Sequence, residues 1–303
     1  MLLLKTLFPI FTSTVLPVFL IAAAGFALAH FLTIDSRSVG RILFYLATPS
    51  LVFRSLYQME IDYTALQHLT IVAGSAAILT GLLGWLVGMG YDRRQRAAIV
   101  LTSAVSNNGN MGIPISLFAF GSTGVAFATI YYVVSSFMSN TFGVIVASAG
   151  QTSIGSALKQ SLRVPVLYAA AAGFLLNGLG SELPTPLFRA VDLLADAAVP
   201  GMLVLMGVQL HSAPIFQAQS VILRSVAVRL LAGPAIAWLL CALLGVNGVE
   251  RSVLILQAAM PTAVMTAVLA TEYDIAPRLV ASIIFFSTVI SMVTLSLVLW
   301  LVM

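Results

Sequence analysis

Apolar runs of about 20 residues follow one another along nearly the whole chain, and a helix of that length crosses the hydrocarbon core of a bilayer. A membrane barrel would instead show alternating segments of about ten residues, and the chain has no such pattern. Hydrophobic residues make up 60% of the 303 positions and charged residues only 8%. Because no water-soluble domain needs so much apolar surface, the sequence predicts an all-α polytopic membrane protein.

The hydropathy pattern predicts ten transmembrane helices, and the longest linker between them divides the chain into two groups of five. This linker, residues 148–162, is small and polar, so residues 1–147 form a first five-helix repeat and residues 163–303 a second. No small-residue cleavage site follows Lys5 before the first run ends at Leu32, so we expect a retained first span and not a signal peptide. The predicted spans are residues 9–32, 38–57, 65–90, 94–120, 123–147, 163–180, 186–210, 219–245, 251–272 and 276–302.

The two halves resemble each other in the order of their prolines. Ala-Thr-Pro ends at Pro49 in span two and Ala-Val-Pro ends at Pro200 in span seven, while Pro114 and Pro261 interrupt spans four and nine. The separations within the two halves are similar, 65 and 61 residues. Because five is odd, the second half must be inserted upside down relative to the first. This arrangement is typical of secondary transporters, in which two broken helices, here 4 and 9, meet near the midplane.

Basic residues predict the orientation, because Lys and Arg concentrate in cytoplasmic loops. The predicted spans place ten of them on one side and four on the other, so both termini are expected outside and the 148–162 linker inside. Arg224 and Arg229 are expected to snorkel from the start of span eight. The cytoplasmic group is Arg37, Arg41, Arg93, Arg94, Arg96, Lys159, Arg163, Arg224, Arg229 and Arg278, and the outer group is Lys5, Arg54, Arg189 and Arg251.

Span four carries a stretch that opposes a continuous helix. Proline has no N–H to donate, each glycine costs roughly 1 kcal/mol against alanine, and asparagine side chains compete for backbone groups. We therefore expect the helix to stop near Ser106 and to restart near Ile113, with the freed groups buried in protein or facing a wet cavity. A lone proline would indicate a plain kink, but here several such residues converge on one turn: Asn107, Asn108, Gly109, Asn110, Gly112 and Pro114.

The residues Asn-Asn-Gly-Asn-Met-Gly-Ile-Pro at 107–114 and Ala-Thr-Pro-Ser-Leu-Val-Phe-Arg-Ser-Leu at 47–56 make the chain resemble the auxin efflux carrier family. The bacterial branch is the better match, because the large cytoplasmic loop of many plant members is absent. The resemblance implies a fold like that of the bile-acid sodium symporters, with helices 1, 2, 6 and 7 as scaffold and helices 3–5 and 8–10 as a moving transport domain. It also implies small organic anions as substrates, such as auxin or dicarboxylates.

The candidate substrate site lies at the two predicted breaks. The amino end of a helix that restarts near Ile113 is worth about half a positive charge and suits a carboxylate. The resemblance assigns carboxylate contacts to Asn107 and Asn110, and Thr262 adds a hydroxyl from the opposing break. Because span nine has no Asn or Gly at its break, a plain proline kink there is equally open. The full set of expected substrate-binding residues is Asn107, Asn108, Gly109, Asn110, Pro114, Pro261 and Thr262.

Charged residues inside spans are the second signal. Asp196 lies well inside span seven with no partner near it in sequence, whereas Arg189 and Asp192 are expected to pair. Asp196 is the candidate for carrying a coupling proton, and a structural carboxylate near a kink is the alternative. No cofactor and no metal are expected, because no cluster of His, Asp, Glu or Cys has ligand spacing and no phosphate loop is present.

These observations predict a secondary active transporter that carries a small organic anion by an elevator-type alternating-access motion. The alternatives are an ion or solute channel and a sodium-coupled organic anion symporter. An enzyme is not expected, because titratable residues do not cluster. The expected surroundings are a cell membrane, the inner membrane if the source is bacterial, with the anion and the lipid bilayer as partners and no nucleic acid. Whether the scaffold helices also form a homodimer is left open.

Overall fold

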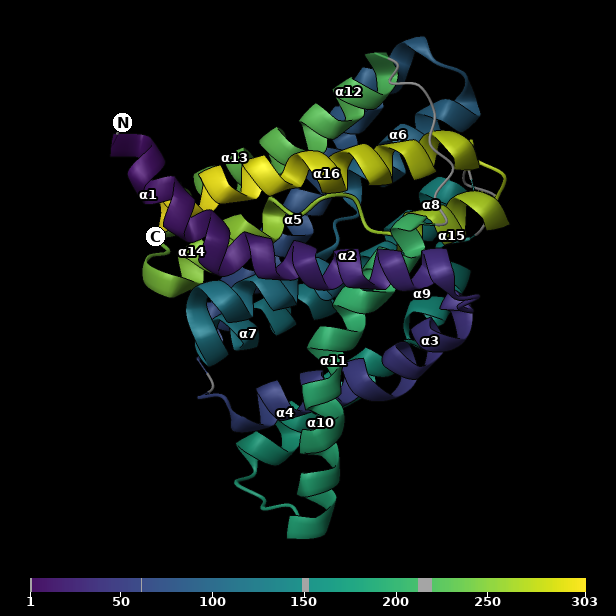
Figure 1. Ribbon diagram of the computed structural model, residues 1–303. Helices are drawn as coiled ribbons and strands as arrows, with labels where there is room; N and C mark the ends of the chain where they lie inside the picture. The colour runs from purple at the N-terminus through teal and green to yellow at the C-terminus, as the bar shows by residue number, and fades with distance from the viewer. Residues whose placement is uncertain (1, 61, 149–152, 212–219) are drawn as a thin grey trace.

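The computed structural model describes residues 2–60, 62–148, 153–211 and 220–303 (Figure 1). Within these residues the protein is helical, with a single isolated β-bridge and no strand. Six helices of the described part are long and apolar enough to cross a membrane, which confirms the prediction of a polytopic membrane protein. They are Thr6–Phe31, Tyr63–Gly90, Asn108–Ala147, Thr185–His211, Ser220–Leu244 and Pro277–Val302.

Several of these helices contain a π-turn, a stretch of five residues with a wider backbone. These π-turns are labelled η1, η2, η4, η5 and η6, while η3 is a 3-10 turn of three residues. The first half of the chain runs through α1 (Leu2–Ile10), η1 (Phe11–Val15), α2 (Leu16–Phe31), α3 (Ser36–Ile42), η2 (Leu43–Ala47), α4 (Thr48–Gln58), α5 (Tyr63–Val87), η3 (Gly88–Gly90), α6 (Arg93–Ala104), η4 (Asn108–Gly112), α7 (Ile113–Met138), η5 (Ser139–Gly143) and α8 (Val144–Ala147). The second half runs through α9 (Ile154–Ser161), α10 (Pro165–Gly178), α11 (Thr185–His211), α12 (Ser220–Ala227), η6 (Val228–Ala232), α13 (Gly233–Leu244), α14 (Gly248–Ala258), α15 (Met265–Glu272) and α16 (Pro277–Val302).

Helix starts account for several of the few acidic residues in the chain. Asp35, Asp62 and Asp92 each accept a backbone N–H from the first turn of α3, α5 and α6, the standard way to satisfy the unpaired donors there. Ser153 does the same for α9, because its side chain accepts from the N–H of Ser156. The stretch 148–162, expected to be a small polar linker, contains this helix, and its residues 149–152 lie outside the described part.

Two pairs of helices pack closely because glycine removes the side chain at the contact. A Cβ at Gly207 of α11 would collide with the Ala22 carbonyl of α2, and one at Gly25 of α2 would collide with the Val204 carbonyl of α11. A Cβ at Gly173 of α10 would lie 2.9 Å from the Phe53 carbonyl of α4. Such small-residue contacts let helix backbones approach in a membrane. The helices α2, α4, α10 and α11 therefore form one packed group (Figure 1).

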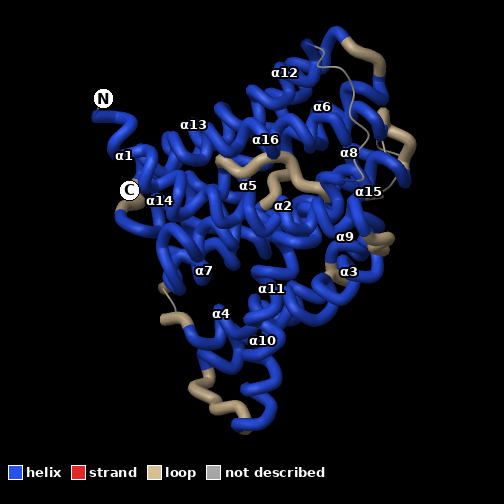
Figure 2. The backbone as a smooth tube through the Cα atoms, in the orientation of Figure 1, coloured by secondary structure: helices blue, strands red, loops and turns tan. Residues whose placement is uncertain are grey.

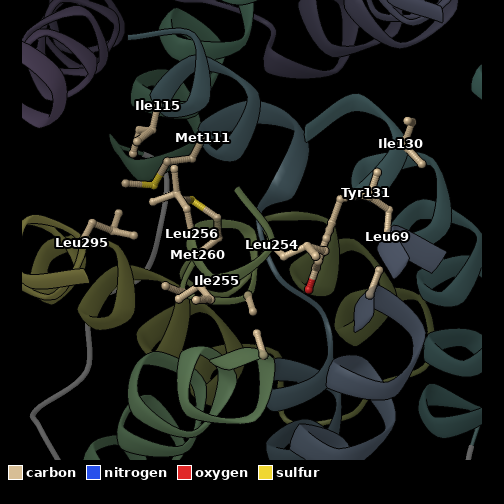
Figure 3. Packing of buried hydrophobic residues seen from close by; sticks show 14 of the residues in the cluster. Leu69, Met111, Ile115, Ile130, Tyr131, Leu254, Ile255, Leu256, Met260 and Leu295 are labelled. Carbon is tan, nitrogen blue, oxygen red and sulfur yellow. The ribbon is translucent and has the colours of Figure 1, made fainter. Parts of the chain in front are cut away.

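A second group contains α5, α6, α7, α13, α14 and α16, with its core next to two loop-coloured stretches in the interior (Figure 2). Met111 from η4 and Ile115 from the start of α7 pack with Leu256 of α14 and with Met260, two residues after the end of α14 (Figure 3). All four side chains belong to the largest buried cluster. This apolar packing fixes where the interior stretches can lie.

The two ends of the chain lie side by side. Nε1 of Trp300, near the end of α16, donates to Oγ1 of Thr6 in α1 at 3.0 Å. Figure 1 accordingly shows the N and C labels at the same end of the molecule. The first helix begins at Leu2, seven residues before the expected span, and residue 219 at the expected start of span eight lies outside the described part.

Candidate functional site

Two short non-helical stretches, residues 105–107 and 259–264, meet inside the protein, and we call this meeting place, together with the turn Asn108–Gly112 that follows the first stretch, the crossing. Ser106 and Thr262 face each other as an antiparallel bridge. The Asn107 N–H donates to the carbonyl of Pro261 at 2.8 Å, and the Ala263 N–H donates to the carbonyl of Val105 at 3.0 Å. Each stretch thereby supplies partners for the other, which satisfies backbone groups that would cost several kcal/mol each if left bare in hydrocarbon.

The first stretch is shorter than the sequence indicates. α6 ends at Ala104, two residues before the expected stop, but the helix resumes at Asn108 and not near Ile113. Residues Asn108–Gly112 form the π-turn η4, closed by a 3.0 Å bond from the Gly112 N–H to the Asn107 carbonyl. Pro114 therefore lies in the first turn of α7 and not at the break.

The same arrangement, a π-turn followed by a proline in the next α-helix, occurs at four places. Pro17, Pro49, Pro114 and Pro234 each stand two residues after the end of a π-turn, in the first turn of the next α-helix. A proline ring clashes with the carbonyl four residues before it, and a π-turn moves that carbonyl aside. Proline in these spans therefore marks a widened turn that leaves the helix continuous.

Asn108 is fully hydrogen bonded inside the protein. Its Oδ1 accepts from the hydroxyls of Ser106 at 2.6 Å and Ser135 at 2.7 Å. Its Nδ2 donates to the backbone carbonyl of Gln257 at 2.7 Å and to Gln257 Oε1 at 3.0 Å. Gln257 Nε2 in turn donates to the Ser116 hydroxyl at 3.0 Å. With 1% of its surface exposed, Asn108 ties the two interrupted helices together and has no group left for a ligand.

Asn107 and Asn110 differ from their neighbour. The Asn107 amide is 4% exposed, and within the described residues its Nδ2 reaches only the sulfur of Met206, at 3.9 Å. Asn110 is half-buried, and none of the side-chain hydrogen bonds given for the described chain involves it. A buried amide that makes so few hydrogen bonds is costly to keep unless something else uses it. These two side chains are the crossing's available polar groups.

The glycines of η4 allow close packing. A Cβ at Gly109 would lie 2.7 Å from the ring of Tyr132, and a Cβ at Gly112 would collide with the Gln257 amide. Gly112 is therefore needed for α14 to approach the start of α7. Neither glycine has a positive φ, so close approach is the reason for both.

Pro261 and Thr262 make hydrogen bonds that hold the second stretch in place. The Pro261 carbonyl accepts from Asn107, as described, and Thr262 is fully buried. Thr262 Oγ1 donates to the carbonyl of Thr102 at 2.9 Å, in the last turn of α6, and the Thr262 N–H donates to the Ser287 hydroxyl at 3.2 Å. This threonine satisfies a carbonyl at a helix end that would otherwise have no partner.

Asp196 lies on α11 in a cluster with one cation. Arg54 Nη1 bonds Asp192 Oδ1 at 2.7 Å and Asp196 Oδ1 at 2.6 Å, which links α4 to α11. The expected pair between Arg189 and Asp192 is therefore wrong, because Arg54 from a neighbouring helix reaches Asp192 first. The Asp196 side chain is 66% exposed, so its pair with Arg54 is screened by solvent.

Sequence reasoning missed Arg229 and Gln257. Arg229 is 2% exposed inside η6 and donates to backbone carbonyls of α6 and α14, so the expectation that it snorkels to the surface is wrong. The available signal was its depth in span eight, because Arg229 lies ten residues after the expected start of that apolar span. Gln257 carried no signal, because one polar residue in α14 does not reveal its partner on another helix.

Two cavities of the described residues lie away from the crossing. A cavity of about 450 Å³ is lined by Phe120, Trp238 and Arg251 among others, and the Arg251 guanidinium stands 4.4 Å from the Trp238 ring centre. Neither this cavity nor the second one described, beside Tyr63, is lined by Asn107, Asn110 or Thr262. The described residues also contain no group of three His, Cys, Asp or Glu side chains that could hold a metal ion.

Comparison with known proteins identifies the family. The model of a family described as "Membrane transport protein" matches residues 10–299. An "Uncharacterized transporter" of Methanothermobacter thermautotrophicus is 29% identical over 293 residues, which cover 94% of this chain and 96% of the relative. A "Putative malonate transporter" of Rhizobium meliloti is 26% identical over 306 residues, covering 96% and 95%.

A plant relative matches over a shorter region. The "Probable auxin efflux carrier component 1b" of Oryza sativa is 26% identical over 140 residues, which cover 44% of this chain and 25% of the relative. The family model, in contrast, spans nearly the whole chain and confirms the resemblance drawn from residues 47–56 and 107–114. The chain therefore belongs to the auxin efflux carrier family of membrane transport proteins, and is a multi-pass membrane protein of that family.

Proposed function

We propose that the protein is a secondary active transporter for a small organic anion, with its substrate site at the crossing. One observation carries the proposal: the Asn107 amide reaches only the sulfur of Met206, at 3.9 Å, the Asn110 side chain makes no hydrogen bond in the described part of the chain, and both lie at the amino end of the helix that begins at Asn108. A helix amino end carries about half a positive charge and unpaired N–H groups, which suit a carboxylate. Neutral amides add donors without adding charge.

The substrate class follows from this chemistry together with the relatives' names. One relative is named a putative malonate transporter and another a probable auxin efflux carrier, and both names refer to carboxylic acids. A short carboxylate fits a site of a few donors near one helix end. We therefore propose a small mono- or dicarboxylate as the transported anion.

The proposed architecture is ten spans in a 5+5 inverted repeat, with α6/α7 and α14/α15 as the two broken, crossing helices. Residues 1–147 and 163–303 are the repeats, joined through 148–162. The glycine contacts among α2, α4, α10 and α11 support a rigid scaffold, and the remaining helices would move against it as an elevator. The neighbouring termini support an even number of crossings.

The count of basic residues predicts the same orientation when the buried Arg229 is left out. Nine basic residues of the cytoplasmic group then remain against four of the outer group. Both termini are proposed to face outside. A Lys159→Cys variant in α9 should resist an impermeant thiol reagent in intact cells, since the native Cys241 is buried. Labelling of that residue from outside would reverse the orientation.

Coupling is proposed to use protons or no ion. The crossing has no Asp or Glu between residues 102 and 116 or between 257 and 266, so it lacks the carboxylates a dedicated cation cage favours. Asp196 stays the candidate for carrying the proton. The sodium-coupled symporter is the alternative, and a strict sodium requirement for uptake would favour it.

Counterflow in proteoliposomes tests the proposal against a channel. Purified protein is reconstituted with unlabelled malonate, succinate or indole-3-acetate inside, and entry of the labelled compound is followed with and without sodium. A carrier gives entry that speeds up with internal substrate and saturates, because the loaded site exchanges. Entry that does not respond to internal substrate for any carboxylate would contradict the proposal.

A further inference from the structure

A single buried cation touches both interrupted helices. Arg229 lies in η6, and its Nη1 donates to the carbonyl of Ser103 at 2.8 Å. Its Nη2 donates to the carbonyl of Ala258. None of the ion pairs in the described part of the chain involves Arg229, and its Nε has no hydrogen-bond partner there. The guanidinium is thus a full positive charge inside the protein with no carboxylate to balance it.

The two acceptors belong to helix ends. Ser103 is in the last turn of α6, which ends at Ala104, and Ala258 is the last residue of α14. The last carbonyls of a helix lack intrahelical partners and carry about half a negative charge. The planar fork of an arginine reaches both carbonyls at once in a fixed geometry, whereas a lysine ammonium would bring the same charge to the two helix ends with a looser geometry.

The surrounding backbone is built around this side chain. A Cβ at Gly233, the first residue of α13, would collide with both the Ala258 carbonyl and the Arg229 guanidinium. Glycine at this position therefore lets α13 approach the end of α14 with the arginine between them. The arrangement is specific, because a surface arginine would need no such space.

With Arg229 in place, the partial charges of the four helix ends at the crossing are no longer balanced. Two carboxyl ends contribute about half a negative charge each, and the amino ends at Asn108 and Met265 contribute about half a positive charge each, so the four helix ends alone sum to about zero. Arg229 offsets the two carboxyl ends and leaves the two amino ends unopposed. Burial strengthens this field, since charges interact more strongly in low dielectric than in water.

We propose that Arg229 determines the charge selectivity of the site: by capping α6 and α14 it makes the crossing select carboxylates over uncharged analogues. This inference rests on the proposed function, and it assigns to Arg229 a positioning role through the helix ends, with no contact to substrate. The buried Asn107 amide, which lies at the same crossing and reaches only the Met206 sulfur, is the group on which the selected anion would bind.

Charge-paired ligands test the inference. Purified full-length protein is titrated with malonate and malonamide, and with indole-3-acetate and indole-3-acetamide, because each amide matches its acid in shape and lacks its charge. Wild-type protein should prefer the acid. Arg229→Gln should reduce that preference about tenfold or more, the equivalent of about 1.4 kcal/mol, while amide binding stays within a factor of a few. Arg229→Lys keeps the charge and should keep most of the preference.

Arg224→Gln is the matched control, because it removes the same charge from an exposed position five residues earlier in the same span, in α12. It should leave the preference unchanged. If Arg229→Gln does not fold, judged by thermal unfolding, the Arg229→Lys variant decides: a lost preference with the charge present would overturn the inference. Equal loss of acid and amide binding in Arg229→Gln would also overturn it, since that is what a purely structural cap does. Wild-type protein that does not prefer the acids would instead refute the proposed function.

Discussion

The two stretches of the crossing both interrupt a helix inside the protein, but they differ in length, in the helix that follows and in their side chains. The first stretch is three residues long and continues through a π-turn into α7, a helix of 26 residues. The second stretch spans residues 259–264 and leads into α15, a helix of eight residues. The first carries asparagines, whereas the second carries Met260, Pro261 and Thr262, all fully buried or nearly so.

This difference shows a division of roles. In the second stretch the available polar groups are already used, because Thr262 bonds both α6 and α16. At the first stretch and the π-turn η4 that follows it, Asn108 is used in the same way, whereas the Asn107 amide reaches only the Met206 sulfur and the Asn110 side chain makes no hydrogen bond in the described part of the chain. The second stretch holds the crossing together, and the first both holds it and presents free groups. The predictions below test this division.

The largest effect is expected for Asn108→Ala. The substitution leaves Ser106, Ser135 and Gln257 without their partner, and each buried unsatisfied group costs roughly 1–3 kcal/mol, so the variant should lose about 3–9 kcal/mol of unfolding free energy. Thermal unfolding in detergent measures it. Ser139→Ala is the control, since that hydroxyl bonds only the Ser135 carbonyl of its own helix. An Asn108 variant as stable as the control would contradict the structural role.

A smaller effect is expected for Thr262→Val, which preserves shape and removes the hydrogen bond to the Thr102 carbonyl. The loss should be roughly 1–3 kcal/mol of unfolding free energy, with substrate affinity close to wild type. Thr271→Val provides the comparison, because Thr271 is exposed and bonds only its own helix. If Thr262→Val instead weakened binding without destabilising the protein, the second stretch would be part of the site and the division of roles would fail.

The smallest effect on stability is expected for Asp196→Asn, because an exposed ion pair is worth at most about 1 kcal/mol and Arg54 keeps its bond to Asp192. Neither stretch of the crossing has a carboxylate, so coupling chemistry must lie outside both. As proton carrier, Asp196→Asn should flatten the pH dependence of counterflow, while Asp192→Asn should not. A wild-type pH profile in Asp196→Asn would remove Asp196 from that role.

Much of the fold could be predicted from the sequence, because apolar runs and acidic helix caps act locally. The end of α6 was predicted to within two residues, since Pro114, the glycines and the asparagines all weaken the helix nearby. The π-turns could not be predicted. A proline indicates only that the backbone carbonyl four residues before it must move aside, and the sequence does not show that a π-turn moves it. The helix α9 inside the 148–162 linker was also missed, since it is short and polar.

The site was harder to predict than the fold. Asn107 and Asn108 are identical neighbours in sequence, and only the positions of Ser135 and Gln257 on other helices show that one is used and the other is not. Arg229 was misassigned for a related reason: its acceptors are backbone carbonyls of distant helices, and backbone carbonyls leave no trace in a sequence.

Substrate titration of Asn107→Ala against Arg251→Gln tests the central claim, that the free groups of the first stretch bind the anion. Arg251 lines the cavity of about 450 Å³ and is the competing cation for a carboxylate. A lost hydrogen bond to a charged group is worth roughly 1.5–3 kcal/mol, so Asn107→Ala should bind malonate about ten- to a hundredfold more weakly, with an unchanged unfolding temperature. Arg251→Gln should bind malonate as wild type does. Unchanged affinity in Asn107→Ala together with a large loss in Arg251→Gln would show that the anion binds in the cavity and not at the crossing.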